Sequence, residues 1–534
     1  MKLLIDGSVH VINEPMTLEE INSDLNIVAA VVDGKLREKN YLVTKDCAIK
    51  WVTLESSDGK QIYERSLILL FLYTCHKLYP HAHIKIEHAL QDGLYCTIDK
   101  EACLKPSEVK KIKEQMQVYV KDDIKIIRQK FNQKQAIQHF ISNGLVNKAK
   151  LLKVRNKEEY SVYKLDDYED YFFGLMVPST KYLKEISLEY FSFGLRLARK
   201  DVTINQYKLF NCMQEYERWG ELIHVSSIAN VNEVVRSNRL KELMLMSEAM
   251  IDKKLSELAS IIEKDKKNIR MILIAGPSSA GKTTFSYRLA IHLKILGIEP
   301  VNLSMDDFYL NREDTPKLPD GSYDFESIEA VDLELFNETI LKLINQEEVY
   351  LPRFNFKTGL RYYDQKPTTL RKNQVLIIEG IHGLNPKTSS YIPKYAKFKI
   401  YINALTHLNY DEHHRISTSD YRLIRRIVRD HQFRNWSATQ TILHWPKVKY
   451  GEDHYIYPYQ EEADYIFNTS MVYELPVLKP IAKSLLDEVS MDSAAYLEAN
   501  RLNKLLDYIE GANISIPQDS LLTEFVGNSI FTNE

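Results

Sequence analysis

The sequence predicts an α/β protein in which two small α+β domains precede a larger domain with a parallel sheet and helices on both faces. Two buried-strand runs indicate the parallel sheet: MILIAG, from Met271, and VLIIEGI, from Val375, with helical patterns between them. The amino-terminal segment instead shows short strands separated by turn residues, which is typical of a small α+β domain. The length of 534 residues fits about three or four domains.

Composition and charge exclude several classes of protein. The chain has 70 Lys and Arg residues against 73 Asp and Glu residues, a net charge of −3, so it has no overall basic field for non-specific binding of nucleic acid or membranes. Hydrophobic residues at 44% and charged residues at 27% exclude a disordered or fibrous chain. The longest strongly apolar run, Leu67–Tyr73, is too short to cross a membrane.

The amino-terminal residues and the cysteines indicate the cellular compartment of the protein. Asp6 and His10 lie where a signal peptide would need an unbroken apolar stretch. The cysteines are odd in number and have no spacing typical of zinc sites: Cys47, Cys75, Cys96, Cys103 and Cys212. We therefore expect a cytoplasmic protein with reduced thiols and no membrane attachment.

The pattern of apolar residues predicts the elements in order. Residues 1–60 should form a small sheet from MKLLI, from IVAAVVDGKL with a turn at Asp33–Gly34, and from AIKWVTLES, closed by a turn at Asp58–Gly59. Helical spacing then predicts helices at Glu64–Tyr79, Pro106–Lys130, Val231–Lys267 and Ala494–Leu506. The third is expected to be one long amphipathic helix that bridges two halves of the protein, with a domain boundary near its end.

The most specific motif is a phosphate-binding loop. Gly276-Pro277-Ser278-Ser279-Ala280-Gly281-Lys282-Thr283 fits the pattern G-x-x-x-x-G-K-[ST], between a strand and a helix expected to begin at Thr283. The glycines let backbone N–H groups converge on phosphate oxygens, Lys282 adds a point charge and the Thr283 hydroxyl is a magnesium ligand. Glu379, at the end of VLIIEG, could approach the same magnesium ion. A strand-end acid that faces solvent is the alternative for Glu379.

Two further groups indicate phosphoryl transfer. Asp306, Asp307 and Tyr309 follow a strand at the edge where α/β sheets bind ligands, so a carboxylate there could accept a hydroxyl proton. A second group is a run of arginines, Arg422, Arg425, Arg426, Arg429 and Arg434. Such a density of like charge suits a lid that closes on phosphates. A solvated basic face is the alternative, because three of these side chains cannot all point one way on a helix.

These stretches together resemble the uridine kinase and phosphoribulokinase family of P-loop kinases. The resemblance covers about Met271 to Asn468 and rests on GPSSAGKTT, MDDFY, DFESIEAVD, LPRFNF with Arg361, IIEGI and RLIRRIVRD, in family order. It implies a P-loop kinase fold with ATP and Mg²⁺ as cofactors. It implies ATP contacts from Gly276, Ser278, Ser279, Ala280, Gly281, Lys282, Thr283, Thr284, Arg429 and Arg434.

The same resemblance implies the remaining roles. Asp306 would be the catalytic base, assisted by Lys282 and Arg429, and Thr283 with Glu379 would hold the metal. The acceptor would be bound by Tyr309, Glu326, Phe354, Arg361 and Arg426.

Four positions depart from the uridine kinase pattern. Glu326 stands where the family has an aspartate for the ribose hydroxyls. Phe354 and Gly359 stand where a tyrosine and a histidine read the base, and Trp436 replaces an arginine. We expect phosphorylation of the primary hydroxyl of a nucleoside with the base left open. The alternatives are a kinase of a sugar phosphate or other small alcohol and a nucleotide-switched RNA-binding protein.

The amino-terminal half resembles two modules of threonyl-tRNA synthetases, in the same order. Residues 1–60 resemble the ubiquitin-like TGS domain, and the region from Gln61 to Arg199 resembles the second, editing domain through RSLILLF, LYPHAHIKIEHALQDGLY and VPSTKYL. In those synthetases, histidines and a cysteine carry out editing. At the matching positions this chain has Arg65, Leu69, Phe172 and Met176 instead. None of these can activate water or bind a metal, so editing is not expected. His76, His81, His83 and His88 match no metal-ligand pattern.

Five segments are therefore expected: a TGS-like domain at 1–60, a degenerate editing-type module at 61–230, a helical linker at 231–268, a kinase domain at 269–480 and a helical tail at 481–534. The amino-terminal modules are expected to regulate the kinase or to contact RNA. A homo-oligomer is left open.

Overall fold

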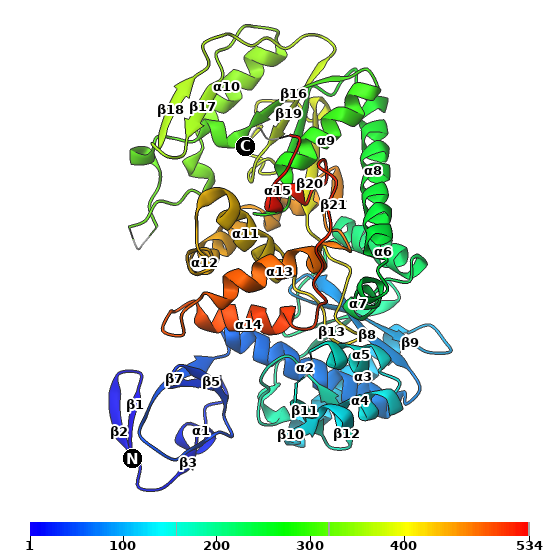
Figure 1. Cartoon of the computed structure of the whole chain (residues 1–534), viewed down its shortest axis with the longest axis vertical. Helices are drawn as coiled ribbons and strands as arrows, with labels where there is room; N and C mark the ends of the chain where they lie inside the picture. Colours follow the sequence, from blue (N-terminus) through cyan, green and yellow to red (C-terminus); the bar gives the residue numbers. More distant parts are fainter. Residues whose placement is uncertain (156, 319–320, 532–534) are drawn as a thin grey trace. The chain divides into compact units, whose positions relative to one another are not determined.

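The structure is a computed structural model that describes residues 1–155, 157–318 and 321–531. The chain forms two compact units, each discontinuous in sequence (Figure 1). The amino-terminal unit comprises Met1–Asn205, Ser226–Ala229 and His407–Arg415. The carboxyl-terminal unit comprises Gln206–Val225, Asn230–Thr406 and Ile416–Glu534.

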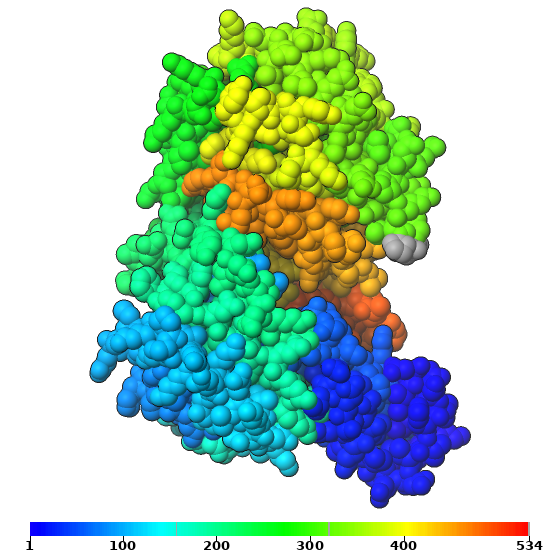
Figure 2. All heavy atoms as spheres, turned by 180° about the vertical axis from the view of Figure 1, so that it is seen from behind, coloured from blue at the N-terminus to red at the C-terminus, as the bar shows by residue number. Residues whose placement is uncertain are grey.

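The first segment of the amino-terminal unit is a five-stranded sheet in the order β2-β1-β7-β4-β5, seen as a rounded lobe in dark blue in Figure 2. Its strands are β1 Lys2–Ile5, β2 Ser8–Val11, β4 Ile27–Val32, β5 Lys35–Glu38 and β7 Cys47–Thr53; β3 Met16–Thr17 pairs with β6 Leu42–Val43 beside helix α1 Leu18–Ile21. The turn predicted at Asp33–Gly34 is confirmed, with both residues at positive φ as a two-residue hairpin requires.

The turn predicted at Asp58–Gly59 is wrong. These residues lie in the first turn of helix α2 (Ser57–Leu78), because the Ser56 hydroxyl accepts a hydrogen bond from the Gly59 amide at 3.1 Å and caps the helix. Helix α2 contains the predicted helix at 64–79. It is buried on all sides between Leu67 and Cys75.

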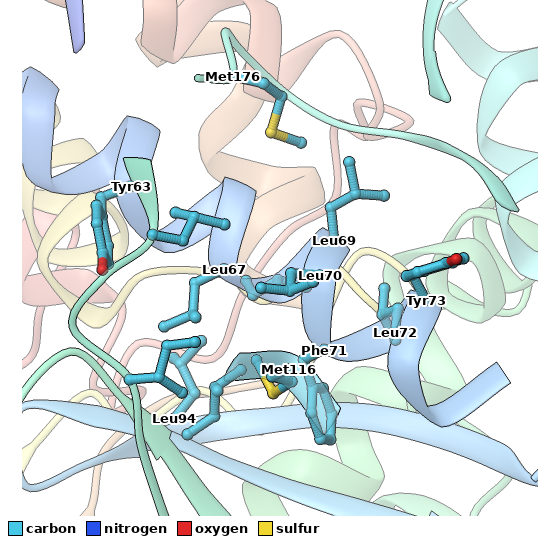
Figure 3. Close-up of a cluster of buried hydrophobic side chains, with 14 of the residues drawn as sticks. Tyr63, Leu67, Leu69, Leu70, Phe71, Leu72, Tyr73, Leu94, Met116 and Met176 are labelled. Carbon is cyan, nitrogen blue, oxygen red and sulfur yellow. The ribbon is translucent and has the colours of Figure 1, made fainter. Parts of the chain in front are cut away.

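The rest of the amino-terminal unit surrounds α2. A four-stranded sheet has the order β13-β14-β9-β8 and a three-stranded sheet the order β10-β11-β12. The elements are β8 His83–Leu90, β9 Gly93–Asp99, α3 Pro106–Lys121, β10 Ile126–Asn132, α4 Gln133–Ser142, α5 Val146–Arg155, β11 Glu159–Leu165, β12 Tyr168–Tyr171, β13 Ser187–Phe191 and β14 Gly194–Ala198. Figure 3 shows side chains of α2 packed with Leu94, Met116 and Met176.

The lysine-rich helix predicted at Pro106–Lys130 is shorter than expected. It ends at Lys121, and Asp123 adopts a positive φ of 48° that a helix cannot continue through. Residues from Ile126 onward instead pair with β11, so tertiary pairing overrides the local helical pattern in this segment.

The carboxyl-terminal unit contains the predicted parallel sheet, in the order β16-β19-β15-β20-β21 with every neighbouring pair parallel. Its strands are β15 Met271–Ala275, β16 Glu299–Ser304, β19 Gln374–Glu379, β20 Lys397–Asn403 and β21 Tyr465–Asn468, with a separate hairpin of β17 Pro352–Asn355 and β18 Leu360–Tyr363. All five residues of β15 are buried, so other elements cover both faces of the sheet.

Helices make up much of this half of the chain. They are α6 Tyr207–Leu222, α7 Ile228–Arg236, α8 Leu240–Lys264, α9 Lys282–Ile295, α10 Leu333–Ile344, α11 Thr418–Arg434, α12 Ala438–Tyr455, α13 Glu474–Asp487, α14 Tyr496–Leu506 and α15 Thr523–Val526. Met271 and Leu273 of β15 pack with Phe336 and Ile340 of α10, and α9 contacts β15, β16 and β19. The predicted tail helix at 494–506 corresponds to α14. The last residues of the expected tail, 532–534, lie outside the described residues.

The single long helix predicted at Val231–Lys267 is wrong. Two helices, α7 and α8, are separated at residues 237–239, where Asn238 has a positive φ of 56°. The Ser237 hydroxyl donates to the Glu233 and Val234 carbonyls and closes the end of α7. In the described part of the chain, no helix combines the length and the hydropathy needed to cross a membrane.

Candidate active site

The phosphate-binding loop connects β15 to α9 and depends on two glycines. A Cβ atom on Gly276 would lie 2.1 Å from the Ile402 carbonyl oxygen, so only glycine fits. Gly281 has a φ of +87°, in the left-handed region. The first hydrogen bond of the helix runs from the Phe285 amide to the Gly281 carbonyl, so the helix ladder does not use the amides before Phe285. Lys282 donates from Nζ to the Gly276 and Pro277 carbonyls at 3.1 and 3.3 Å, which holds the ammonium group over the loop.

Two carboxylates already bind amides of this loop. Glu452 Oε1 accepts a hydrogen bond from the Ser278 amide at 3.1 Å, and Glu524 Oε2 accepts one from the Thr284 amide at 3.0 Å. Anionic oxygens therefore occupy donors that a phosphate would use at a helix amino terminus. The loop therefore has the form of a phosphate-binding site for a nucleotide.

The two neighbouring aspartates after β16 have different environments. The Asp307 carboxylate accepts hydrogen bonds from Arg353 Nη1 at 3.0 Å and from the Phe354 amide at 3.4 Å. The Asp306 carboxylate has no hydrogen-bond or ion-pair partner among the described residues. Burial raises the pKa of Asp306, and the Lys282 ammonium opposes this rise. Of the two acids, Asp306 is therefore the one whose oxygens remain available.

Glu379 lies at the end of β19, directly opposite Ser304 of β16. Its Oε1 accepts a hydrogen bond from the Ser304 hydroxyl at 3.0 Å. Burial and the negative charge of Asp306 raise the pKa of Glu379 to about 7, while Lys282 opposes the rise. Glu379 is thus a partly buried acid beside Asp306 and the loop lysine, not an acid that faces solvent.

Two of the five arginines hold the loop in place. Arg422 forms a buried bidentate pair with Glu452, and its Nη1 donates to the Ser278 carbonyl at 2.9 Å. Arg425 forms a second buried pair with Glu474 and donates to the Ser279 carbonyl at 3.2 Å. Because each of these cations faces its own carboxylate, they stabilise the loop and leave little charge for a ligand.

The other three arginines converge on one acid, Asp430. Its carboxylate oxygens lie 3.1 Å from Arg426 Nε, 3.0 Å from Arg429 Nη2 and 3.5 Å from Arg434 Nη1. Arg426 also donates from Nη1 to the Ser278 hydroxyl at 2.7 Å. Burial and the charge of Arg429 lower the pKa of Arg434 to about 10. Three cations on one carboxylate leave positive charge beside the loop, which favours an anionic ligand.

An aromatic cluster surrounds Tyr309, which follows β16 in the chain. Tyr309 lies 5.7 Å from Phe354 and 6.2 Å from Phe356 between ring centroids, and its hydroxyl donates to the Phe325 carbonyl at 3.0 Å. Burial raises the pKa of Glu326 to about 7, although Arg426 opposes the rise. The negative charges of Glu452 and Asp306 add to this rise.

Arg361 and Gly359 have structural partners in this region. Arg361 pairs with Asp332 at 2.9 Å and donates from Nη2 to the Tyr309 carbonyl at 2.8 Å, so its guanidinium braces the segment that carries Tyr309. A Cβ atom on Gly359, at a φ of +74°, would lie 2.7 Å from Arg312 Nε. A histidine at position 359 would therefore clash unless Arg312 moved. Trp436 packs edge-on against His444 at 5.5 Å.

Sequence reasoning missed four acids at this site. Asp430 lies four residues from both Arg426 and Arg434, and this i,i+4 spacing could have identified it. Glu452, Glu474 and Glu524 lie far along the chain from their partners, so no local signal could have found them.

In the amino-terminal unit, the positions expected for editing residues belong to the core. Leu69, Phe172 and Met176 are buried in one apolar cluster, and Figure 3 shows Leu69 and Met176 within it. Arg65 donates from Nε to the Leu175 carbonyl at 3.2 Å. Among the described residues, no group of three or more His, Cys, Asp or Glu side chains is arranged to hold a metal ion.

Comparison with known proteins finds matches in both halves of the chain. Residues 271–475 match the sequence model of the phosphoribulokinase / uridine kinase family. The amino-terminal region is 30% identical over 192 residues to the threonine–tRNA ligase of Legionella pneumophila (strain Corby) and 32% identical over 162 residues to that of Clostridium kluyveri (strain NBRC 12016). The matches cover 35% and 30% of this chain and 30% and 25% of the ligases, so the chain spans less than a third of the length of these relatives.

Solved structures are similar to part of the chain. One, described as a possible uridine kinase from Bacillus stearothermophilus, is 17% identical with a TM-score of 0.29 and covers 41% of this chain and 100% of that chain. A D-glycerate 3-kinase from Cryptococcus neoformans is 12% identical with a TM-score of 0.22 and covers 50% of this chain and 93% of that one. The carboxyl-terminal region of this chain, at 271–475, is a P-loop kinase domain of the phosphoribulokinase / uridine kinase family, joined to an amino-terminal region similar to that of threonine–tRNA ligases.

Proposed function

We propose that the protein transfers a phosphoryl group from ATP to the primary hydroxyl of a nucleoside, in the cytoplasm. The observation that carries this proposal is the contrast between two adjacent acids. Asp307 is held by Arg353 and the Phe354 amide, whereas Asp306 has no partner among the described residues and lies near Lys282. A partly buried carboxylate without a partner is suited to accept a proton from an acceptor hydroxyl.

The phosphates of ATP would be bound by the loop and by the arginines of α11. Backbone amides of the loop between Gly276 and Thr284, Pro277 excepted, would cradle the phosphates. Lys282, Arg429 and Arg434 would neutralise the charge that develops on the transferred group. Thr283 and Glu379 are suited to hold Mg²⁺, which supplies further positive charge when bound. Since the structure offers few protein ligands there, phosphate and water oxygens would complete the coordination.

The acceptor would lie between Asp306 and the aromatic cluster. Glu326 would hold ribose hydroxyls, Tyr309 and Phe354 would offer an apolar face to the base, and Arg361 and Arg426 would hold these elements in place. Because Phe354 and Gly359 carry no side-chain hydrogen-bond group, the base would be recognised mainly by shape and stacking.

A kinase of another small alcohol, such as a sugar phosphate, is the second candidate. Phe354 and Gly359 favour it, because a site without side-chain hydrogen bonds to a nucleobase does not require an acceptor that carries a base.

For either acceptor, we propose that the chain divides into segments at 1–60, 61–230, 231–268, 269–480 and 481–534. The amino-terminal modules would regulate the kinase or contact RNA.

The direct test is acceptor-dependent release of ADP from ATP and Mg²⁺. The acceptors would be uridine, cytidine, adenosine, guanosine, inosine, ribose and ribulose 5-phosphate, with Asp306→Asn as the inactive control. Turnover with one nucleoside that disappears in the variant would support the proposal and identify the base. Turnover only with ribulose 5-phosphate or ribose would support the second candidate, and no acceptor-dependent turnover would contradict both.

A further inference from the structure

The carboxyl-terminal segment 519–531, hereafter the tail, returns to the phosphate-binding loop. It contains the short helix α15, and Glu524 of this helix places Oε2 3.0 Å from the Thr284 amide nitrogen. The Glu524 side chain is partly exposed and has no ion-pair partner among the described residues. Its one hydrogen bond is therefore to a loop amide.

The neighbouring residues anchor the tail to both helices beside the loop. Phe525 is fully buried, and its ring centroid lies 4.7 Å from the Arg425 guanidinium of α11. Leu521 and Leu522 are also fully buried. Phe531 stacks on Tyr287 of α9 with ring centroids 5.6 Å apart and planes within 6° of parallel. The tail thus bridges the helix that begins at the loop and the helix that carries the arginines.

The contact of Glu524 occupies a donor that a phosphate needs. The Thr284 amide precedes the first intrahelical hydrogen bond of α9, so it is one of the amides directed at a bound anion. Glu452 also binds a loop amide, but Arg422 and Tyr457 hold that carboxylate in a buried network. Glu524 has no such partner for its carboxylate among the described residues, so a more highly charged anion can displace it from the Thr284 amide.

We propose that the tail is an autoinhibitory segment that competes with nucleotide for the phosphate-binding loop, with Glu524 in the place of a phosphate oxygen. This inference rests on the nucleotide site of the proposed function. Binding of ATP requires Glu524 to release the Thr284 amide, which loosens α15 from α9 and α11. A partner or modification that removes the tail would activate the enzyme.

The test compares two variants that each remove one acid from the tail. Glu524→Ala removes the competing carboxylate. Asp519→Ala is the matched control, because Asp519 is exposed and its carboxylate accepts no hydrogen bond among the described residues. The probe is a non-hydrolysable ATP analogue with Mg²⁺, titrated by calorimetry into the full chain. We expect Glu524→Ala to lower the Kd on the order of tenfold, since a hydrogen bond to a charged group is lost from the competing state. Asp519→Ala should bind as the wild type does.

Hydrogen exchange supplies an independent measurement. Adding the analogue to the wild-type chain should accelerate exchange of amides within 519–531, since the tail must be displaced. Thermal melting checks that Glu524→Ala folds, which we expect because its side chain is partly exposed. Glu524→Gln keeps an oxygen that can accept from Thr284 but loses the charge, so its Kd should lie between those of the wild type and Glu524→Ala.

The outcomes separate this inference from the proposed function. If the wild type and Glu524→Ala bind the analogue equally well, or the variant binds it more weakly, the tail does not compete and the nucleotide site stands. If neither binds the analogue, the nucleotide site and the autoinhibition are both wrong.

Discussion

Each unit of the molecule buries a cluster of charged side chains, and the two clusters differ in how their charge is balanced. In the amino-terminal unit, Asp170 is fully buried and binds Lys148, His413 and the Tyr171 amide. In the carboxyl-terminal unit, the single carboxylate of Asp430 faces Arg426, Arg429 and Arg434.

This difference separates a structural cluster from one that can bind a ligand. Burial would raise the pKa of Asp170, but Lys148 and His413 lower it below its ordinary value, so the acid is ionised and neutralised by its neighbours. Positive charge beside the phosphate-binding loop is not neutralised by the described residues in the same way. A closed pair stabilises a fold, whereas unbalanced charge favours a ligand of opposite sign.

The largest expected effect is on the stability of the amino-terminal unit. Lys148→Met leaves Asp170 buried without its main cation, so we expect the free energy of unfolding of this unit to fall by about 3–5 kcal/mol. Urea unfolding followed by hydrogen exchange in α5 and β12 measures this loss. Lys153→Met, on an exposed position of the same helix, is the control and should change stability little. Equal stability of the two variants would show that the cluster does not stabilise the unit.

A second pair of variants compares arginines on one helix. Arg422→Ala should lower the stability of the carboxyl-terminal unit by about 3–5 kcal/mol, because Glu452 loses its buried partner. Arg429→Ala should leave stability within about 1 kcal/mol but lower kcat by about 10²–10³, because a cation beside the transferred phosphoryl group is lost. Thermal melting and steady-state kinetics distinguish the two effects. Lost kcat without lost stability in Arg422→Ala would contradict these assignments.

The smallest expected effect is a pH dependence. The pKa of Glu326 is raised to about 7 in the folded state from 4.5, so folding takes up a proton between these values. The stability that Glu326 contributes is therefore fully present below about pH 4.5 and is lost as the pH rises through about 7. We expect about 2 kcal/mol more stability of the carboxyl-terminal unit at pH 5 than at pH 8, reduced in Glu326→Gln. Urea unfolding at both pH values measures it, and an equal pH dependence in the variant would exclude Glu326 as its cause.

Local sequence signals sufficed where a short segment determines the structure. The loop from Gly276 to Thr283 is specified by Gly276, where a Cβ atom would clash, by Gly281, which has a positive φ, and by the strand and helix that flank it. The parallel sheet followed from its continuous apolar runs, since strands covered on both faces need no polar alternation. The turn at Asp33–Gly34 followed from the residues that tolerate positive φ.

Most of the wrong predictions concern segments whose structure depends on residues far away in the sequence. The extension expected to Lys130 is a strand in the structure because β11 is available to pair with it. Asp58–Gly59 is a different case, because the Ser56 cap that makes these residues helical is itself a local signal. The segment His407–Arg415 joins the amino-terminal unit although it follows a kinase strand in the chain, and it contributes His413 to the Asp170 cluster. No pattern within that segment indicates this partner.

If an unpartnered charge at the loop marks the reacting group, the two adjacent acids Asp306 and Asp307 should differ in their effect on catalysis. Asp306→Asn and Asp307→Asn remove the same charge one residue apart, and kcat is measured with the best acceptor at saturating ATP and Mg²⁺. We expect Asp306→Asn to lower kcat by about 10²–10⁴ with an unchanged melting temperature, and Asp307→Asn to lower kcat less than about tenfold. Equal losses in the two variants, or a larger loss in Asp307→Asn, would contradict this expectation.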